Sequence, residues 1–297
     1  MGIKYLNKYL LKKCGKNSIY DIHLKHLKNK TIVIDTYIYL YKLSENGDLS
    51  KNMSKFIQMF LKNNITPIFI FDGKPPIEKE QTLLERKKNK KEAENKYNQL
   101  MSLSSMDEKG CFDNNVSLEL QHLKKQFIRI HKEDIKNVKS VMDDYNVAYI
   151  DAPNEADSLC VYMVKKNVAW ACLSDDMDMF VYGCNRVIRN LDISTESAVL
   201  YNLNNILFDL KCNMKEFREI LVLSGTDYNS NPNNAFSLTD VLKIFHDYKK
   251  TKIQENFYHW LMSNTNYIDN FEHLMKTYNL FIVDNYNTLY KKYILPF

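Results

Sequence analysis

Long hydrophobic runs are missing from this sequence, and glycine and proline are scarce. Only 7 glycines and 6 prolines occur among 297 residues. The apolar runs extend over roughly five to seven residues, whereas a membrane-spanning helix needs about 20. Residues 1–6 also contain no secretory hydrophobic region. The sequence therefore predicts an intracellular protein that does not associate with a membrane.

Cysteine pairs of the kind that bind zinc are missing as well. The six cysteines are scattered singly, with no CxxC pair and no Cys/His spacing that suits zinc. They are Cys14, Cys111, Cys160, Cys172, Cys184 and Cys212. We expect these thiols to be reduced and free, as in most intracellular proteins.

The excess of positive charge is small, because 41 basic and 36 acidic residues leave a net charge of +5. The distribution of the basic residues is more informative than their excess. Eight of them fall within one stretch: Lys74, Lys79, Arg86, Lys87, Lys88, Lys90, Lys91 and Lys96. This stretch indicates a nucleic-acid partner. The hydrophobic share of 45% is enough for one large α/β domain or two small ones.

Four short apolar runs each lead into acidic residues. Residues 31–34 precede Asp35, residues 67–71 precede Asp72, residues 147–150 precede Asp151, and residues 168–173 precede Asp176 and Asp178. Continuous apolar strands separated by helical stretches are typical of a parallel sheet covered on both faces. We therefore predict an α/β fold, with two of its helices at residues 51–63 and 154–166.

The acidic residues predict a metal site, because ligands of an open α/β sheet bind beyond the carboxyl ends of its strands. Carboxylates about 4 Å apart repel by roughly 4 kcal/mol per pair at an effective dielectric constant of 20. A convergent cluster would thus need divalent cations. The candidates are Asp35, Asp72, Glu155, Asp157, Asp176, Asp178 and Asp227. The alternative is ordinary: a single Asp after a strand is more often a turn or helix N-cap residue.

A charged, helix-favouring insertion occupies residues 76–145, between the second and third predicted strands. We predict two long helices there, at residues 78–100 and 116–145, which rise above the strand ends and do not pack on the sheet. A solvated helical hairpin without a role is the alternative. From Tyr201 onward the sequence predicts helices.

Six motifs, in order, resemble those of the flap endonuclease/XPG superfamily of structure-specific 5′-nucleases. They are residues 1–3 (MGI), 34–41 (IDTYIYLY), 69–76 (FIFDGKPP), 152–157 (APNEAD), 174–178 (SDDMD) followed by Gly183, and 223–228 (LSGTDY). The resemblance implies a PIN-like fold, a mostly parallel central sheet with helices on both faces. It also implies that the seven acids hold two Mg²⁺ or Mn²⁺ ions, with Asp176 essential to catalysis.

The resemblance further assigns residues to catalysis and to DNA. Lys79 and Arg86 match a basic pair at the foot of a helical gateway, where cations would face the scissile phosphate. Tyr41 matches an aromatic ring that stacks on a base; plain core packing is the alternative. The remaining candidates for DNA contact are Gly2, Lys74, Lys87, Lys88, Lys90 and Lys91. Residues 76–145 would form an arch for the 5′ single strand.

One part of the family pattern is missing. Where the family has a glycine-containing helix–two-turn–helix for duplex DNA, residues 229–236 read NSNPNNAF, and a helix is expected from about Leu238. We therefore divide the chain into a nuclease domain, residues 1–228, and a helical C-terminal region, residues 229–297. No clear sliding-clamp-binding peptide occurs near the C-terminus, and residues 294–297 do not qualify.

The resulting hypothesis is a divalent-metal-dependent nuclease that cleaves DNA with a 5′ single-stranded flap, end or junction. We expect a monomer that acts in the nucleus or at a viral replication site. A non-catalytic DNA-binding scaffold and an RNA-cleaving nuclease are the alternatives. A haloacid dehalogenase-type phosphatase fits less well, because Asp35 lacks the second Asp two residues on that its nucleophile motif requires.

Overall fold

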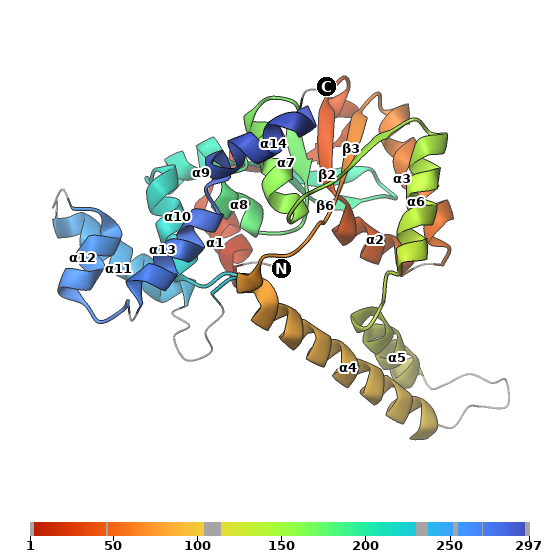
Figure 1. Cartoon of the computed structure of the whole chain (residues 1–297), viewed down its shortest axis with the longest axis horizontal. Helices are drawn as coiled ribbons and strands as arrows, with labels where there is room; N and C mark the ends of the chain where they lie inside the picture. Colours follow the sequence, from red (N-terminus) through yellow and green to blue (C-terminus); the bar gives the residue numbers. More distant parts are fainter. Residues whose placement is uncertain are drawn as a thin grey trace.

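The computed structural model describes residues 3–45, 47–103, 114–229, 237–251, 255–268 and 270–294. Its centre is a seven-stranded sheet with the strand order β1-β7-β6-β5-β2-β3-β4 (Figure 1). The strands are β1 (Ile19–His23), β2 (Thr31–Asp35), β3 (Thr66–Phe71), β4 (Ala148–Asp151), β5 (Ala171–Leu173), β6 (Arg186–Asp192) and β7 (Ser197–Asn202). Strands β4, β3, β2, β5 and β6 are parallel to one another. Strand β7 pairs antiparallel with β6, and β1 pairs antiparallel with β7. The predicted mostly parallel sheet is confirmed.

The four predicted strands correspond to β2, β3, β4 and β5. Sequence analysis did not anticipate β1, β6 and β7, whose pairings β6–β7 and β7–β1 are the antiparallel ones of the sheet. In β1 only Ile19 is buried, so its residues lack a continuous apolar run. The register of β6 and β7 shifts between Arg189 and Asp192, which interrupts the alternation of apolar and polar residues.

Helices cover both faces of the sheet (Figure 1). One hydrophobic core joins it to η1 (Leu24–Leu27), α2 (Thr36–Ser44), α3 (Leu49–Lys62) and α6 (Lys132–Asp144). The other core joins it to α1 (Leu6–Lys13), α7 (Ala156–Lys165), α8 (Asp178–Tyr182) and the helices that follow β7. The helices predicted at residues 51–63 and 154–166 are therefore confirmed as α3 and α7.

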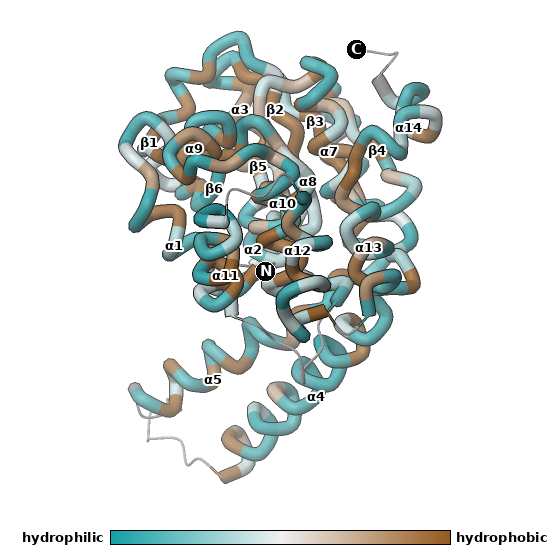
Figure 2. The backbone as a smooth tube through the Cα atoms, turned by 90° about the vertical axis from the view of Figure 1, so that its left-hand side faces the viewer, coloured by the Kyte–Doolittle hydropathy of each residue, from teal (hydrophilic) through white to brown (hydrophobic). Residues whose placement is uncertain are grey.

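The described part of the insertion, residues 76–103 and 114–145, contains three helices after a short 3-10 turn, η2 (Ile77–Lys79), and not two as predicted. Helices α4 (Glu80–Leu103) and α5 (Asn114–Gln126) project from the body, and hydrophilic residues run along most of α4 (Figures 1 and 2). The ring centroids of Tyr97 and Phe127 lie 5.4 Å apart and join the two helices.

The prediction for residues 116–145 was wrong in one respect, because the third helix, α6, packs on the body beside α3. The side chains of Val138 and Met142 on α6 are fully buried. They lie one helical turn apart on α6 and form an apolar face that packs in the hydrophobic core with α3. A new helix start also separates α6 from α5, since Asp134 accepts a hydrogen bond from the backbone N–H of His131 at 2.7 Å.

All described elements after β7 are helical, as predicted. They are α9 (Leu203–Asp209), α10 (Met214–Leu223), α11 (Leu238–Thr251), α12 (Phe257–Asn264), α13 (Phe271–Leu280), η3 (Val283–Tyr286) and α14 (Asn287–Ile294). Helix α11 begins at the predicted residue. The altered segment, residues 229–236, lies outside the described residues except for Asn229, as do residues 295–297.

Two predictions from composition can be compared with the structure. Among the described residues no helix is long and apolar enough to cross a membrane. The five cysteines within them, Cys14, Cys160, Cys172, Cys184 and Cys212, are free thiols, as predicted. Cys111 lies outside the described residues.

Candidate active site

Parallel strands bring the acidic residues to one edge of the sheet. Asp35 is the last residue of β2, and Asp72 directly follows β3, the neighbour of β2. Asp176 follows β5, which pairs with β2 on its other side. The chain therefore reverses its strand order beside β2, and such switch points form ligand sites in α/β folds. Asp72 and Asp176 both act electrostatically on Asp35, so these three carboxylates are near neighbours.

A close backbone approach fixes Asp72 beside the start of α7. The N–H of Gly73 donates a hydrogen bond to the carbonyl of Asn154 at 2.7 Å, and the N–H of Ala156 donates to Asp72 Oδ1 at 2.7 Å. A Cβ atom on Gly73 would lie 2.0 Å from the carbonyl oxygen of Ala152. Only glycine allows this contact, which holds Asp72 next to Glu155 at the N-terminus of α7.

The turn after β5 explains how acids two residues apart can converge. Ser174 Oγ donates to Asp35 Oδ2 at 3.0 Å and accepts from the N–H of Asp176 at 3.2 Å. The N–H of Asp178 donates to Asp176 Oδ1 at 3.0 Å. Since this turn precedes the regular part of α8, its side chains are not spread around a helix as residues two apart would be.

The carboxylates of Asp35 and Asp178 are almost completely buried, with 5% and 3% of each residue exposed. Burial raises the pKa of Asp35 well above its ordinary value, and the charge of Asp72 raises it further. For Asp178, burial is again the main cause of a raised pKa, followed by the charge of Asp176. A cation bound among these carboxylates would therefore favour their charged forms.

Lys79 and Arg86 neutralise part of this charge. The ammonium group of Lys79 forms an ion pair with Glu155 and lies 3.7 Å from Asp227, and the guanidinium group of Arg86 pairs with Asp227. Thr82, between them on α4, donates to the carbonyl of Asp227 at 2.6 Å. Burial by itself would lower the pKa of Lys79, but the charges of Glu155, Asp157 and Asp227 outweigh it and raise that pKa.

Two tyrosines complete the surroundings of Glu155. The hydroxyl of Tyr228 donates a hydrogen bond to Glu155, and the hydroxyl of Tyr182 lies 3.0 Å from that of Tyr228. The ammonium group of Lys79 lies 5.5 Å from the ring centroid of Tyr228. Sequence analysis assigned no role to these hydroxyls. The available signal was that Tyr228 directly follows Asp227 in the motif at residues 223–228.

The donor set has the chemistry that Mg²⁺ or Mn²⁺ requires, because all seven candidate ligands supply carboxylate oxygens. Asp178 Oδ1 is buried and has no hydrogen-bond partner, as expected for an oxygen whose partner is a cation. Within the described residues, however, no three Asp, Glu, His or Cys side chains already enclose a point where a metal could be held. Lys79 and Arg86 contact Glu155 and Asp227, so these two acids are engaged by protein cations.

The described candidates for DNA contact lie on α2, on α4 and in the loop after β3. Lys74, Lys87, Lys88 and Lys91 are exposed, the last three along α4. Tyr41 on α2 is 36% exposed, and it is not a core residue. The ammonium group of Lys90 lies 4.7 Å from the ring centroid of Tyr41 and donates to the carbonyl of Ile128 at 3.2 Å. The structure thus brings Tyr41 and Lys90 together beside Ile128, in the segment that follows α5. Gly2 lies outside the described residues.

Comparison with known proteins agrees with this fold. Family models match in two regions: the XPG N-terminal domain over residues 1–93 and the XPG I-region over residues 146–227. Flap endonuclease 1 of Methanocaldococcus jannaschii is 30% identical over 70% of this chain and 65% of its own length. The matched part therefore spans slightly less than two thirds of that relative. A protein of Invertebrate iridescent virus 6, named probable RAD2-like endonuclease 369L, is 29% identical over 78% of this chain and 68% of its own length.

A solved structure of the catalytic core of Rad2 in complex with DNA substrate shares the fold. Its TM-score is 0.65 at 19% identity, and the match covers 95% of this chain and 86% of that one. The architecture is therefore that of a PIN-like α/β protein with acids at one sheet edge. The chain belongs to the flap endonuclease/XPG superfamily.

Proposed function

We propose that the protein is a divalent-metal-dependent, structure-specific nuclease that hydrolyses DNA phosphodiester bonds at a 5′ flap, end or junction. The observation that carries the proposal is the gathering of carboxylates at the ends of β2, β3 and β5 and at the start of α7, beside Lys79. The names of the two relatives, a flap endonuclease and a RAD2-like endonuclease, support the same reaction. We assign the protein to replication, repair or recombination of DNA.

In this proposal the seven carboxylates hold two Mg²⁺ or Mn²⁺ ions. They are Asp35, Asp72, Glu155, Asp157, Asp176, Asp178 and Asp227. When bound, the ions activate water and neutralise charge on the reacting phosphate. The backbone N–H of Ala156 and the hydroxyls of Ser174 and Tyr228 orient Asp72, Asp35 and Glu155 for this task.

The role of Lys79 and Arg86 is electrostatic. Both sit at the root of α4, and their positive charges stand at the sheet edge where the phosphate would lie. Fixed cations at that place stabilise the negative charge that develops as the phosphodiester bond breaks. Lys87, Lys88, Lys90 and Lys91 continue along α4 and would guide the backbone of a single strand toward the site.

We further propose a nuclease domain at residues 1–228, with an arch at residues 76–145, and a helical C-terminal region at residues 229–297. The projection of α4 and α5 from the body supports the arch (Figure 1). The protein would act as a monomer in the nucleus or at a viral replication site.

The test is cleavage of a labelled 5′-flap DNA with Mg²⁺ and with EDTA. We expect a product with a 5′-phosphate only with Mg²⁺, and no cleavage by the Asp176→Ala variant. Asp21→Ala is the matched control, because Asp21 is exposed on the edge strand β1. Cleavage by Asp176→Ala at the wild-type rate would overturn the site. Flap binding without any cleavage would identify a scaffold, and preferential cleavage of an RNA flap would identify an RNA nuclease.

A further inference from the structure

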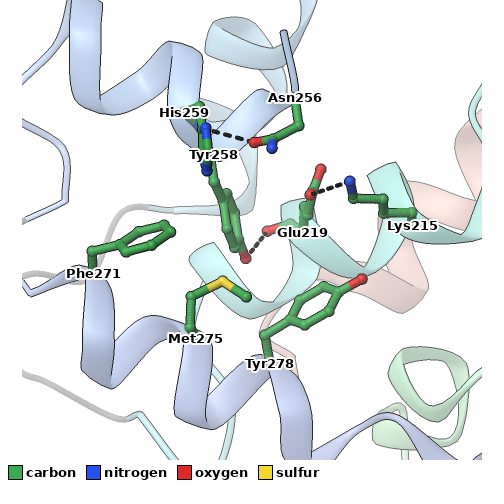
Figure 3. A pocket seen from close by; sticks show the side chains of 8 residues that line it. All are labelled: Lys215, Glu219, Asn256, Tyr258, His259, Phe271, Met275 and Tyr278. Atoms are coloured by element: carbon green, nitrogen blue, oxygen red, sulfur yellow. Dashed lines mark hydrogen bonds and ion pairs between the residues drawn. The ribbon is translucent and has the colours of Figure 1, made fainter.

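A small pocket lies among the C-terminal helices, and the proposed nuclease reaction does not use it. Its walls come from α10, α12 and α13 (Figure 3). Its volume is about 90 Å³. A water molecule occupies about 30 Å³ in the liquid. The space is therefore large enough for a small chemical group. We call it the Glu219 pocket after the acidic residue that lines it.

Glu219 is a buried acidic residue whose carboxylate has few groups around it that stabilise a negative charge. Only 4% of the residue is exposed. Among the described residues its one ionic partner is Lys215, whose ammonium group lies 3.9 Å away on a side chain that is 60% exposed. Burial raises the pKa of Glu219 to about 7. A buried carboxylate without a close partner is costly, so a cation in the pocket would stabilise it.

The other walls suit an organic cation better than a metal ion. Tyr258, Phe271, Met275 and Tyr278 contribute three rings and a thioether to the lining (Figure 3). Tyr258 and Tyr278 lie nearly perpendicular, with ring centroids 6.1 Å apart. Aromatic rings attract ammonium and guanidinium groups through their faces. Mg²⁺ and Ca²⁺ need six or more oxygen ligands, and one carboxylate cannot supply them.

Lys215, which also lines the pocket, is the described ion-pair partner of the carboxylate, at 3.9 Å (Figure 3). The hydroxyl of Tyr258 donates to the backbone carbonyl of Glu219 at 2.9 Å, not to its carboxylate. The guanidinium group of Arg218 lies 5.6 Å from the ring centroid of Tyr278 and donates to the carbonyl of Val181 at 2.8 Å. Arg218 is thus directed toward α8, while Glu219 lines the pocket.

We propose that the Glu219 pocket binds the head group of an organic cation, an alkylammonium or guanidinium group, between the carboxylate and the aromatic walls. Two sources carry this chemistry: a free polyamine, or a lysine or arginine side chain of a partner protein. This site is independent of the proposed nuclease activity, so its test measures binding and not cleavage.

The experiment is calorimetric titration of the full chain with tetramethylammonium chloride, with sodium chloride at equal ionic strength as the salt control. We expect saturable binding of tetramethylammonium only. Glu219→Gln should weaken it at least tenfold. Glu272→Gln on α13, whose side chain is 80% exposed, should leave it unchanged. Equal binding by wild type and Glu219→Gln, or equal heats with both salts, would overturn the proposal.

A second variant protects the test against misfolding. Phe271→Ala removes a partly exposed ring from the pocket and should reduce tetramethylammonium affinity several-fold while the fold persists. Titrations with spermidine and with a short lysine- and arginine-containing peptide then distinguish the two sources. Tighter Glu219-dependent binding of either one identifies the source. If neither binds and tetramethylammonium also fails, the pocket is not a cation site.

Discussion

The hydroxyl of Tyr228 donates a hydrogen bond to Glu155, on the opposite side of a carboxylate that already pairs with Lys79. Oε1 of Glu155 receives the ammonium group and Oε2 receives the phenol. Both oxygens are therefore restrained by donors from different parts of the chain. This arrangement fixes the direction in which Glu155 faces the other acids.

Tyr228→Phe should slow flap cleavage about tenfold and leave substrate affinity nearly unchanged. Loss of the hydroxyl frees one oxygen of Glu155, so the carboxylate is less well oriented, whereas no DNA contact is lost. Tyr290→Phe is the matched control, because that buried hydroxyl lies 2.6 Å from Ser158 Oγ and touches no candidate ligand. Each variant should lose about 1 kcal/mol of stability. Equal cleavage rates for the two variants would refute the positioning role.

Lys79→Ala should reduce the single-turnover rate at least a hundredfold and change the dissociation constant for flap DNA less than threefold. The ammonium group acts on charge that develops during the reaction, and it therefore contributes mainly to the transition state. Lys79→Arg should recover part of the rate. Weakened binding with an unaltered single-turnover rate would show that Lys79 is only a DNA contact.

Asp178→Asn should raise the melting temperature of the protein in EDTA. The variant removes a buried negative charge next to Asp176, and the relief of that repulsion is on the order of 1 kcal/mol. Mg²⁺ should stabilise the wild type, since a ligand of the native state stabilises it, and should stabilise Asp178→Asn much less. Thermal unfolding with and without Mg²⁺ measures both effects. Equal stabilisation of the two proteins would remove Asp178 from the metal site.

Gly73→Ala should destabilise the protein by about 1–3 kcal/mol and abolish cleavage. The new Cβ would overlap the carbonyl oxygen of Ala152 and push β3 away from the loop before α7. Gly15→Ala is the control, because the nearest atom to its Cβ is Asp209 Oδ2 at 3.8 Å. Denaturant unfolding compares the two variants. A Gly73→Ala protein as stable and active as Gly15→Ala would contradict the close approach.

Replacing Lys87, Lys88 and Lys91 together by glutamine should weaken flap binding and lower its salt dependence. If each lysine neutralises one phosphate of a single strand, the slope of log K against log salt falls by about 2 in total. Exposed lysines elsewhere, Lys25, Lys28 and Lys55, provide a control triple variant with the same change in charge. Identical slopes for both triple variants would show that α4 does not guide DNA.

The parallel half of the sheet and its acids could be predicted from the sequence, because apolar strands that end in Asp leave a clear local pattern. Asp35 ends its strand, and Asp72 and Asp176 follow theirs, as the sequence pattern predicted. The antiparallel strands left no such pattern. The strand β1 is stabilised by pairing with β7, a partner that lies far away in the sequence, and pairing of that kind cannot be recognised from local residues.

Contacts between side chains were the least predictable part of the site. The resemblance to a family indicated that Lys79 and Arg86 matter, but not that they pair with Glu155 and Asp227. Nor could spacing indicate that Ser174 joins Asp35 to Asp176. These relationships depend on how loops from separate strands meet. The packing of α6 on the body, in place of a helix that rises above the strand ends, was likewise decided by tertiary burial of Val138 and Met142.

Helix α4 has a mechanical consequence for the acids at its root. Its 24 residues form a rod about 36 Å long, and Lys79 precedes its first residue. Thr82 and Arg86 attach the first two turns to Asp227. A single strand of nucleic acid that pulls on the outer turns of α4 would tilt the helix about this attachment. The tilt would displace the ammonium group of Lys79 from Glu155. Nucleic acid bound to the outer turns of α4 would in this way separate Glu155 and Asp227 from Lys79 and Arg86.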